Sequence, residues 1–592
     1  MIQTFSDLIP YYSWLYIPIV LLAVFSALKY RKNSFFFSSL REKVVSLIFG
    51  IFFVLFYSLG LCLSSGAFIT WKSVGFILVA CCLFSTAIGT VYHYINLYLL
   101  KQFSTTEESA YILSRHPLIF PFIVMMICWM PVFLALYPGL FAYDVAYQLN
   151  QTIGNCDTRH PLFHTYYLKF FYKLGEIIGS YNIGMGISVI LQMVLFSLSL
   201  AYSIKYLISR HVKRAIVIIV LIFFSFVPAF PIIAVSMTKD VLFTAAFIAS
   251  FIKILELNDV GFKSFEIGDW IQILLFFILT SLSRNNGQYA VFAVIAVFFI
   301  QSLNNRSNLK YAYVLVVSAV ILITVSNNLL INVTKAAPGT KNQLLSLPYQ
   351  QIARVYKFDS DIFSPHDKEI VSKLIPGIDY YNEHLSDPVM WGATVFDSSE
   401  NKRLFFEIYI KYLLKKPVRY VEAFLINTIG YWYLDDLSDS QIYGRVSNDY
   451  VTLPNRDVQD PFGLFLMFTQ PGYGVAHESK ISWLDDVIKQ LFHENKYQNI
   501  PIIAVIFSIG VYSWLFTMLC FYCLQKKNNK AIVPIVFVLS YGATLFAGPC
   551  VLFRYALPYI CCIPAFMVTV YGDDRMLKKF VTQRANAIKC TR

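Results

Sequence analysis

An aspartate at the end of an apolar run is the first residue in this chain whose position suggests chemistry. The run from Pro121 to Leu136 is strongly apolar and is followed by Tyr137-Pro-Gly-Leu-Phe-Ala-Tyr-Asp144. An acid at the edge of a bilayer loses hydration and needs compensation, so such placement is usually functional. Low-dielectric surroundings also raise the basicity of a carboxylate, and Asp144 could therefore accept a proton from a hydroxyl group.

Three further polar clusters stand where apolar runs begin or end. Lysine and arginine in these clusters could neutralise a phosphate, and asparagine could donate amide hydrogen bonds. Ordinary ion pairs, a helix cap or hydrogen-bonding struts would explain the same residues without chemistry. The candidate catalytic residues are Asp144 and Asp240, and the candidate substrate-binding residues are Tyr143, His160, His164, Lys239, Arg284, Asn285, Asn286 and Arg554.

The sequence predicts no metal-binding residues and identifies no cofactor. A divalent cation is nevertheless compatible with phosphate chemistry. His160 and His164 lack the further ligands that a zinc site requires. Neither a Ser-His-acid set nor a glycine-rich phosphate loop is recognisable. Cys520 and Cys523 form a single CxxC pair inside an apolar run, which argues against a redox or metal role.

The elements that would position these residues are membrane helices. The 592 residues are 57% hydrophobic and only 14% charged, too few polar residues for a soluble protein of this size. Apolar runs of about 17 to 25 residues, long enough to cross a bilayer, predict about thirteen spans. They lie near residues 10–28, 44–63, 73–93, 118–137, 181–203, 214–231, 240–255, 269–283, 287–303, 311–333, 498–522, 530–549 and 552–571.

Basic residues concentrate in every second gap between these runs, which places the N-terminus outside and the C-terminus in the cytoplasm. The long gap at residues 334–497, with 17 basic and 21 acidic residues, is then outside. The rest of the chain carries 31 basic and 14 acidic residues. The net charge of +13 therefore reflects membrane topology and indicates no nucleic-acid partner.

Four parts are expected: accessory transmembrane helices (1–117), a transmembrane core with a catalytic outer loop at 138–180 (118–333), an extracytoplasmic domain of mixed structure (334–497), and C-terminal transmembrane helices with a basic tail (498–592). In the outer loop, large apolar residues recur at helical spacing from Phe163 to Ile178. The pattern predicts a helix on the membrane surface, or one packed on the outer domain.

The clusters, in this order and on one side of the membrane, resemble the GT-C superfamily of polytopic glycosyltransferases over roughly Leu118 to Tyr571. The resemblance implies a mainly helical membrane bundle and an inverting transfer of sugar from a polyprenyl-phosphate donor to a glycan or other cell-envelope acceptor. It also implies that Asp144 is the base, that Lys239, Arg284 and Arg554 hold the lipid phosphate, and that Asp240 positions the acceptor. The chain departs from the family in its three preceding spans and in lacking an Asp-x-Asp or Asp-Glu pair at Asp144.

These features indicate a multi-pass cell-membrane enzyme with an extracytoplasmic active site, and the abundance of Phe, Tyr, Ile, Asn and Lys indicates a bacterial source. A polysaccharide polymerase shares the large outer loop and the membrane cations, so it remains an alternative. A transporter or flippase of lipid-linked sugars would also be polytopic. Transporters, however, tend to place their charges near the bilayer midplane and to show repeats.

Overall fold

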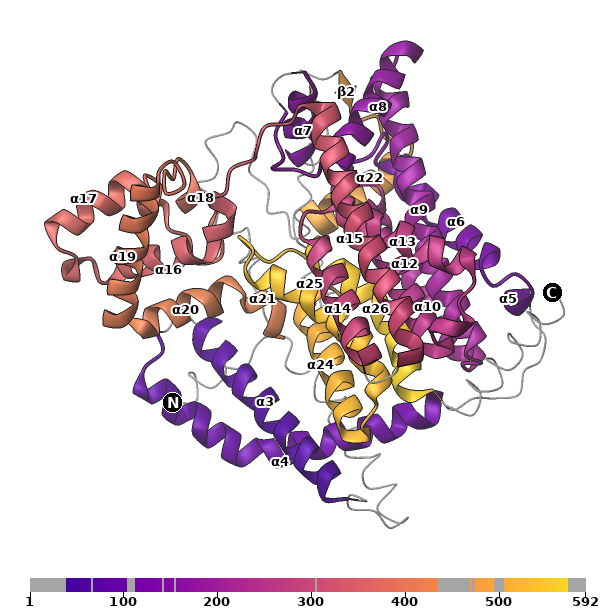
Figure 1. The fold of residues 1–592 in the computed structure, drawn as a ribbon, viewed down its shortest axis with the longest axis horizontal. Helices are drawn as coiled ribbons and strands as arrows, with labels where there is room; N and C mark the ends of the chain where they lie inside the picture. The colour runs from indigo at the N-terminus through magenta and orange to yellow at the C-terminus, as the bar shows by residue number, and fades with distance from the viewer. Residues whose placement is uncertain are drawn as a thin grey trace.

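The computed structural model describes residues 39–64, 68–103, 112–140, 143–153, 156–303, 306–434, 469–470, 474–493 and 505–572, and it is mostly helical (Figure 1). The predicted span at 10–28 and the basic tail lie outside these ranges.

The helices of the first two thirds of the chain are α3 (Leu40–Ser64), α4 (Trp71–Phe103), α5 (Ile112–Arg115), α6 (Ile119–Ala135), α7 (Tyr143–Ile153), α8 (Leu162–Ile178), α9 (Tyr181–Ser209), α10 (Arg214–Phe226), α11 (Ala229–Ala234), α12 (Lys239–Val260), η2 (Phe262–Ser264), α13 (Ile267–Ser283), α14 (Gly287–Leu303) and α15 (Arg306–Thr334). The later elements are η3 (Asn342–Leu345), α16 (Ser346–Phe358), η4 (Ser360–Ile362), α17 (Pro365–Leu374), η5 (Ile378–Tyr380), α18 (Asp387–Met390), α19 (Ser399–Lys415), α20 (Pro417–Asn427), α21 (Ile429–Trp432), β1 (Thr469–Gln470), β2 (Val475–Ala476), α22 (Ser482–Ile488), η9 (Lys489–His493), α24 (Ile509–Lys526), η11 (Asn529–Ala531), α25 (Ile532–Phe546) and α26 (Phe553–Tyr571).

Several helices have the length and composition of membrane spans. Each predicted span from 44–63 onward overlaps a helix. Within the part of the chain that the structure describes, six helical segments are long and apolar enough to cross a membrane: α3, α4, α9, Ser307–Thr334 of α15, Asn529–Phe546 and α26. Four shorter apolar helices, α6, α10, α13 and α14, accompany them. The sequence therefore predicted the positions of the apolar helices well.

Helices α9, α12 and α26 form the centre of the body. Nearly all of α12 from Asp240 to Leu257 is buried, as expected for a helix that is apolar on every side. Its far end meets the ends of α9 and α26, where the Tyr206 hydroxyl donates to Asp259 at 2.9 Å and lies 3.4 Å from the Thr569 hydroxyl. Arg210 pairs with the same aspartate at 3.2 Å. Since α12 and α26 run side by side from one end to the other, their first residues share the opposite end.

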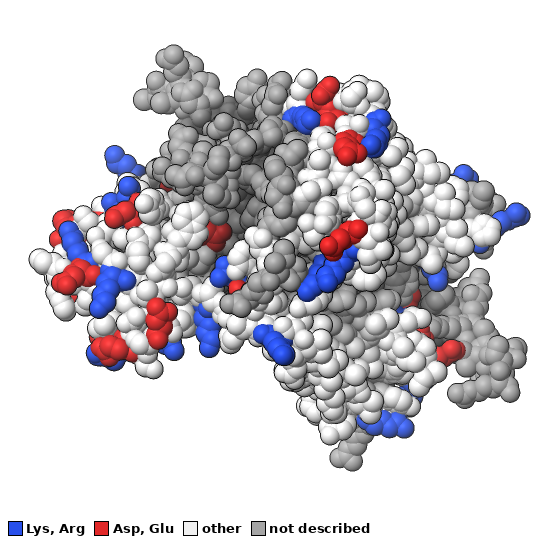
Figure 2. All heavy atoms as spheres, turned by 90° about the horizontal axis from the view of Figure 1, so that it is seen from above, with Lys and Arg blue, Asp and Glu red and all other residues white. Residues whose placement is uncertain are grey.

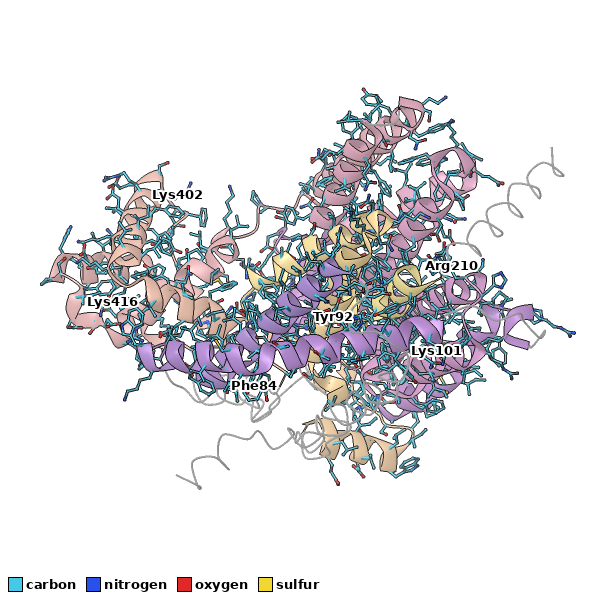
Figure 3. The ribbon with its side chains drawn as sticks, turned by 90° about the horizontal axis from the view of Figure 1, so that it is seen from below. Phe84, Tyr92, Lys101, Arg210, Lys402 and Lys416 are labelled. Carbon is cyan, nitrogen blue, oxygen red and sulfur yellow. The ribbon has the colours of Figure 1, made fainter. Side chains whose placement is uncertain are left out.

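Small residues bring α3 and α4 together into a close hairpin. A Cβ atom on Gly50 would lie 2.0 Å from the Ser85 carbonyl oxygen, and one on Gly89 would lie 2.4 Å from that of Ser46. Glycine at such positions lets membrane helices approach closely. Figure 3 shows α4 crossing the underside of the body, with Tyr92 buried along its length.

Residues 345–420 form a separate helical lobe with its own apolar core, built from α16, α17, α19 and α20. The expected mixture of structure is thus largely helical in the described part, and β1 and β2 pair as one short antiparallel ladder. On the visible face, charges of both signs alternate over this lobe, whereas the rest of the body is mostly uncharged (Figure 2). Such a difference fits a polar lobe beside a body that faces lipid.

A buried carboxylate ties this lobe to the loop between α3 and α4. Glu422 is fully buried and accepts hydrogen bonds from Arg354 Nε and Arg419 Nη1, both at 3.0 Å. It also accepts one from the backbone N–H of Ile69 at 2.7 Å. The Phe68 ring lies 3.9 Å from the Arg419 guanidinium carbon, a cation–π contact. The lobe is therefore anchored to the N-terminal hairpin as well as to its chain neighbours.

Helix α8 exists as the spacing predicts, but its packed side differs from the predicted stripe. His164, Leu168 and Phe171 are buried, whereas Phe170 is 62% and Ile177 is 83% exposed. The helix packs against α9, where a Cβ atom on Gly175 would lie 2.9 Å from the backbone of Tyr181. A glycine that permits close approach selects the packed face here, so large apolar residues are left on the outside.

Candidate functional site

Two chain segments that lead into helices lie side by side and bring the first two polar clusters together. Leu140 donates its backbone N–H to the Val235 carbonyl at 3.0 Å, and Met237 donates to the Leu140 carbonyl at 2.9 Å. Gly139 has a φ of 132°, a conformation that favours glycine, and packs between Val189 and Val235. This parallel bridge sets the start of α7 beside the start of α12.

The side chains at these two starts form an ion pair. Lys239 Nζ lies 3.0 Å from Asp144 Oδ2 and 3.0 Å from His160 Nδ1. Because the ammonium group can only donate, His160 Nδ1 is the acceptor and its proton is on Nε2. Both ion-paired side chains are largely buried, at 14% exposed for Lys239 and 13% for Asp144.

The third and fourth clusters meet at Asp240. This carboxylate is fully buried and accepts from Arg284, and Arg554 Nη1 lies 3.4 Å from its second oxygen. Arg554 is itself fully buried, and its Nη2 lies 3.9 Å from Asp144 Oδ2. The Tyr555 ring lies 4.3 Å from the Arg284 guanidinium carbon. The structure therefore joins Asp144, Lys239, Asp240, Arg284 and Arg554 in one continuous network.

The remaining predicted residues surround this network. Asn285 donates towards the carbonyl oxygens of Thr158 and Arg159 at 3.3 and 3.4 Å, and Asn286 donates to the Thr544 hydroxyl at 2.8 Å. The amide nitrogens of both asparagines are thus engaged with the protein, whereas Asn286 Oδ1 is buried without a hydrogen-bond partner among the described residues. Tyr143 begins α7, but its side chain lies outside the described part of the structure.

His164 lies beneath the network as a buried strut. Its Nδ1 lies 3.0 Å from Gln148 Oε1, and Gln148 Nε2 donates to the Thr165 hydroxyl at 3.0 Å. The amide oxygen can only accept, so His164 carries its proton on Nδ1. This chain of hydrogen bonds holds α7 against α8, while the second ring nitrogen of His164, Nε2, is buried without a hydrogen-bond partner among the described residues.

The charges of the network set the protonation of its members. Burial alone would raise the pKa of Asp144, but the positive charges of Lys239 and Arg554 outweigh it and hold that pKa well below its usual range. Burial, followed by the Lys239 charge, lowers the pKa of His160 to about 3, and the same two causes lower that of His164 to about 3. At neutral pH Asp144 is an anion and both histidines are uncharged.

A sequence model for a family of unknown function, DUF6020, matches residues 155–586, more than half of the chain. The chain belongs to the DUF6020 family. No curated protein and no solved structure matches it. The DUF6020 range contains Lys239, Asp240, Arg284 and Arg554, and it begins after Asp144.

The DUF6020 range also contains an acid near the network that sequence reasoning missed. Asp387 opens α18 in the polar lobe, and burial followed by the negative charge of Asp144 raises its pKa to about 6. It stands alone in a polar segment, with neither periodicity nor a motif around it, so no sequence signal singles it out.

Within the described ranges, no group of three or more His, Cys, Asp and Glu side chains is arranged to hold a metal ion. Three cations and two carboxylates make up the network of this DUF6020 protein, which leaves one positive charge in excess. Chemically, such a site suits an anionic ligand with oxygen atoms for Lys239 and Arg554.

Proposed function

We propose that this protein is a membrane glycosyltransferase of the GT-C type, which transfers a sugar from a polyprenyl-phosphate donor to a hydroxyl group of a glycan or other cell-envelope acceptor. The observation that carries the proposal is the convergence on Asp144 of two cations from different helices, Lys239 of α12 and Arg554 of α26. A carboxylate and cations at the end of membrane helices are what a lipid-phosphate substrate requires.

Lys239 and Arg554 would hold the donor phosphate. Each is within 4 Å of Asp144 Oδ2, so a phosphate oxygen that enters between them shares both cations. Asp240 would act as a positioning residue, because it is fully buried, one of its oxygens accepts from Arg284, and the other lies 3.4 Å from Arg554 Nη1. This differs from the acceptor contact that the family resemblance implies for Asp240.

In the proposed reaction the acceptor hydroxyl gives its proton to Asp144 while its oxygen bonds to the anomeric carbon. The bond between that carbon and the phosphate oxygen breaks, and its electron pair leaves with the polyprenyl phosphate, so the configuration is inverted. Preorganised cations stabilise the charge that develops on phosphate. While it is paired with Lys239, Asp144 is a weak base. A bound phosphate draws off this cation and adds negative charge, so donor binding raises the basicity of Asp144.

An apolar cavity next to the network supports a lipid-linked donor. It has a volume of about 320 Å³ and is lined mainly by aromatic and aliphatic side chains of α3, α20, α21, α24, α25 and α26. Tyr559 lines it one helical turn below Tyr555, which stacks on Arg284. An isoprenoid chain has no hydrogen-bonding groups, and this lining would bury it at no polar cost.

The proposal includes the topology of about thirteen spans, with the N-terminus outside, the C-terminus in the cytoplasm and the site and polar lobe on the extracytoplasmic face. It is supported by the shared end at which α12 and α26 begin. A divalent cation would act only through the donor phosphate.

The test uses purified full-length protein with a panel of polyprenyl-phosphate sugars and glycan acceptors, and measures both polyprenyl phosphate released and glycoside formed. We expect one donor to be consumed, and Asp144→Asn to lower the rate by about 10²- to 10⁴-fold, the usual contribution of a general base. Asp361→Asn, an exposed acid of the polar lobe, is the matched control. Movement of lipid-linked sugar across liposomes without glycoside formation would replace the proposal with transport.

A further inference from the structure

Asp387 is held at the edge of the network by the segment just before Arg554. The backbone N–H of Ser386 donates to the Pro549 carbonyl at 3.0 Å, and its hydroxyl lies 3.4 Å from the same oxygen. Leu385 packs with Cys550 and Leu552 in a small buried cluster. Two residues on one side of Asp387 are thus fixed to the loop that leads into α26, so this acid does not move independently of the site.

The Asp387 carboxylate differs from the two carboxylates of the network in what surrounds it. Asp144 and Asp240 each have cations within 4 Å. Among the described residues, none donates a hydrogen bond to Asp387 or forms an ion pair with it, although the side chain is partly buried. The Asp387 carboxylate oxygens keep some access to solvent, so a ligand can reach them and supply a hydrogen-bond donor.

We infer that Asp387 forms the acceptor side of the site, where it accepts a hydrogen bond from a hydroxyl or amine of a sugar that carries no negative charge. The inference rests on the proposed glycosyl transfer and deepens it by naming the class of acceptor. The cations stand with Asp144 and Asp240 and attract the donor phosphate. An anionic acceptor would instead meet the negative charges of Asp387 and Asp144, and like charges repel. Asp387 neither forms nor breaks a covalent bond in this role.

The charged groups on the elements around Asp387 make the role sensitive to pH. Burial raises the pKa of Asp387 most, and the negative charge of Asp144 on α7 raises it further. Of the other charged groups nearby, Arg354 of α16 is engaged by Glu422 and Glu383, and Asp379 of η5 is exposed. With a pKa raised to about 6, Asp387 is ionised at pH 7.5 and protonated below pH 6. Protonation removes the charged acceptor, so the acceptor KM rises as pH falls through about 6.

The experiment measures kcat and the KM of donor and acceptor separately, from pH 5 to 8, with the purified full-length protein. We expect Asp387→Asn to raise the KM for a neutral sugar acceptor at pH 7.5 about tenfold, the usual effect of losing a hydrogen bond to a charged group. The donor KM stays unchanged, the rise below pH 6 disappears, and a phosphate-bearing sugar becomes a better acceptor relative to the neutral one. Asp379→Asn, in the same lobe, leaves unchanged the two KM values, the rise of the acceptor KM below pH 6 and the preference for the neutral acceptor.

The two levels of the proposal fail differently. If the wild type transfers sugar and Asp387→Asn changes the acceptor KM by less than twofold, with the same pH dependence, the inference falls and the glycosyltransferase proposal stands. If the wild type transfers no sugar from any polyprenyl-phosphate donor, both fall. Asp387→Ser serves as a second variant should the asparagine variant not fold, and the same outcomes apply to it.

Discussion

Replacing Lys239 by glutamine tests the central contact of the site. The change removes the ammonium group that lies 3.0 Å from both Asp144 Oδ2 and His160 Nδ1 and keeps a side chain of similar length. A hydrogen bond to a charged group contributes about 1.5–3 kcal/mol. If Lys239 makes one such bond to the donor phosphate in the transition state, its loss lowers kcat/KM for the donor by about 10- to 150-fold.

Stability gives a second measure of the same contact. In Lys239→Gln the Asp144 carboxylate retains Arg554 at 3.9 Å, so it is not left without a cation. We therefore expect Lys239→Gln to lower the free energy of unfolding by about 1–3 kcal/mol. In a double-mutant cycle, Lys239→Gln and Asp144→Asn should show a coupling energy of about 0.5–3 kcal/mol. Thermal unfolding in detergent, with the single and double variants side by side, measures both quantities.

Donor binding separates a catalytic role from a structural one. A ligand that binds only the folded protein raises its Tm. Polyprenyl phosphate should raise the Tm of the wild type and have a much smaller effect on Lys239→Gln. If the variant is less stable but retains donor kcat/KM within twofold and the full Tm shift, Lys239 is a structural ion-pair partner, and the assignment of the phosphate site is wrong.

Two further predictions concern the elements that hold the site. Asp240→Asn leaves Arg284 and Arg554 buried without their shared carboxylate. Because breaking a buried ion pair costs about 3–5 kcal/mol, thermal unfolding should show a large fall in Tm. An unchanged Tm would mean that the two arginines do not depend on this acid. Gly89→Ala puts a Cβ atom 2.4 Å from the Ser46 carbonyl oxygen and should lower the Tm, whereas Gly75→Ala, which meets nothing within 4 Å, should leave it unchanged or raise it; equal effects of the two would contradict the close packing of α3 and α4.

Much of the arrangement could be predicted because hydropathy and charge act locally. The apolar ranges gave the helices, and the ends of those ranges gave Asp144, Lys239, Arg284 and Arg554, which the structure brings together. Charged side chains buried in membrane segments are costly unless they are paired, so basic and acidic residues at the same end of a helix bundle are expected to form ion pairs with each other.

The rest depended on tertiary contacts that carry no periodic signal. The packed face of α8 includes Gly175, whose missing side chain permits close contact with the start of α9. A glycine adds no signal to a pattern of hydrophobic residues, so this face could not be predicted from the spacing. The segment that contains Asp387 is joined to the loop before Arg554 by the hydrogen bond from Ser386 to the Pro549 carbonyl, a contact between residues far apart in the chain. The amide nitrogens of Asn285 and Asn286 donate to protein partners, and composition cannot distinguish such contacts from ligand contacts.

The contact of Ile69 with Glu422 has a consequence for how the chain matures. The hairpin of α3 and α4 is synthesised well before α20, yet the buried carboxylate of α20 is completed by a backbone N–H from that hairpin. Without the first helices, Glu422 would keep only Arg354 and Arg419 as hydrogen-bond partners. The guanidinium face of Arg419 that now contacts the Phe68 ring would be uncovered. The polar lobe thus depends on the N-terminal helices for part of its buried contacts, and we expect truncations that omit these helices to insert but to leave the lobe less stable, which limited proteolysis of residues 345–420 would measure.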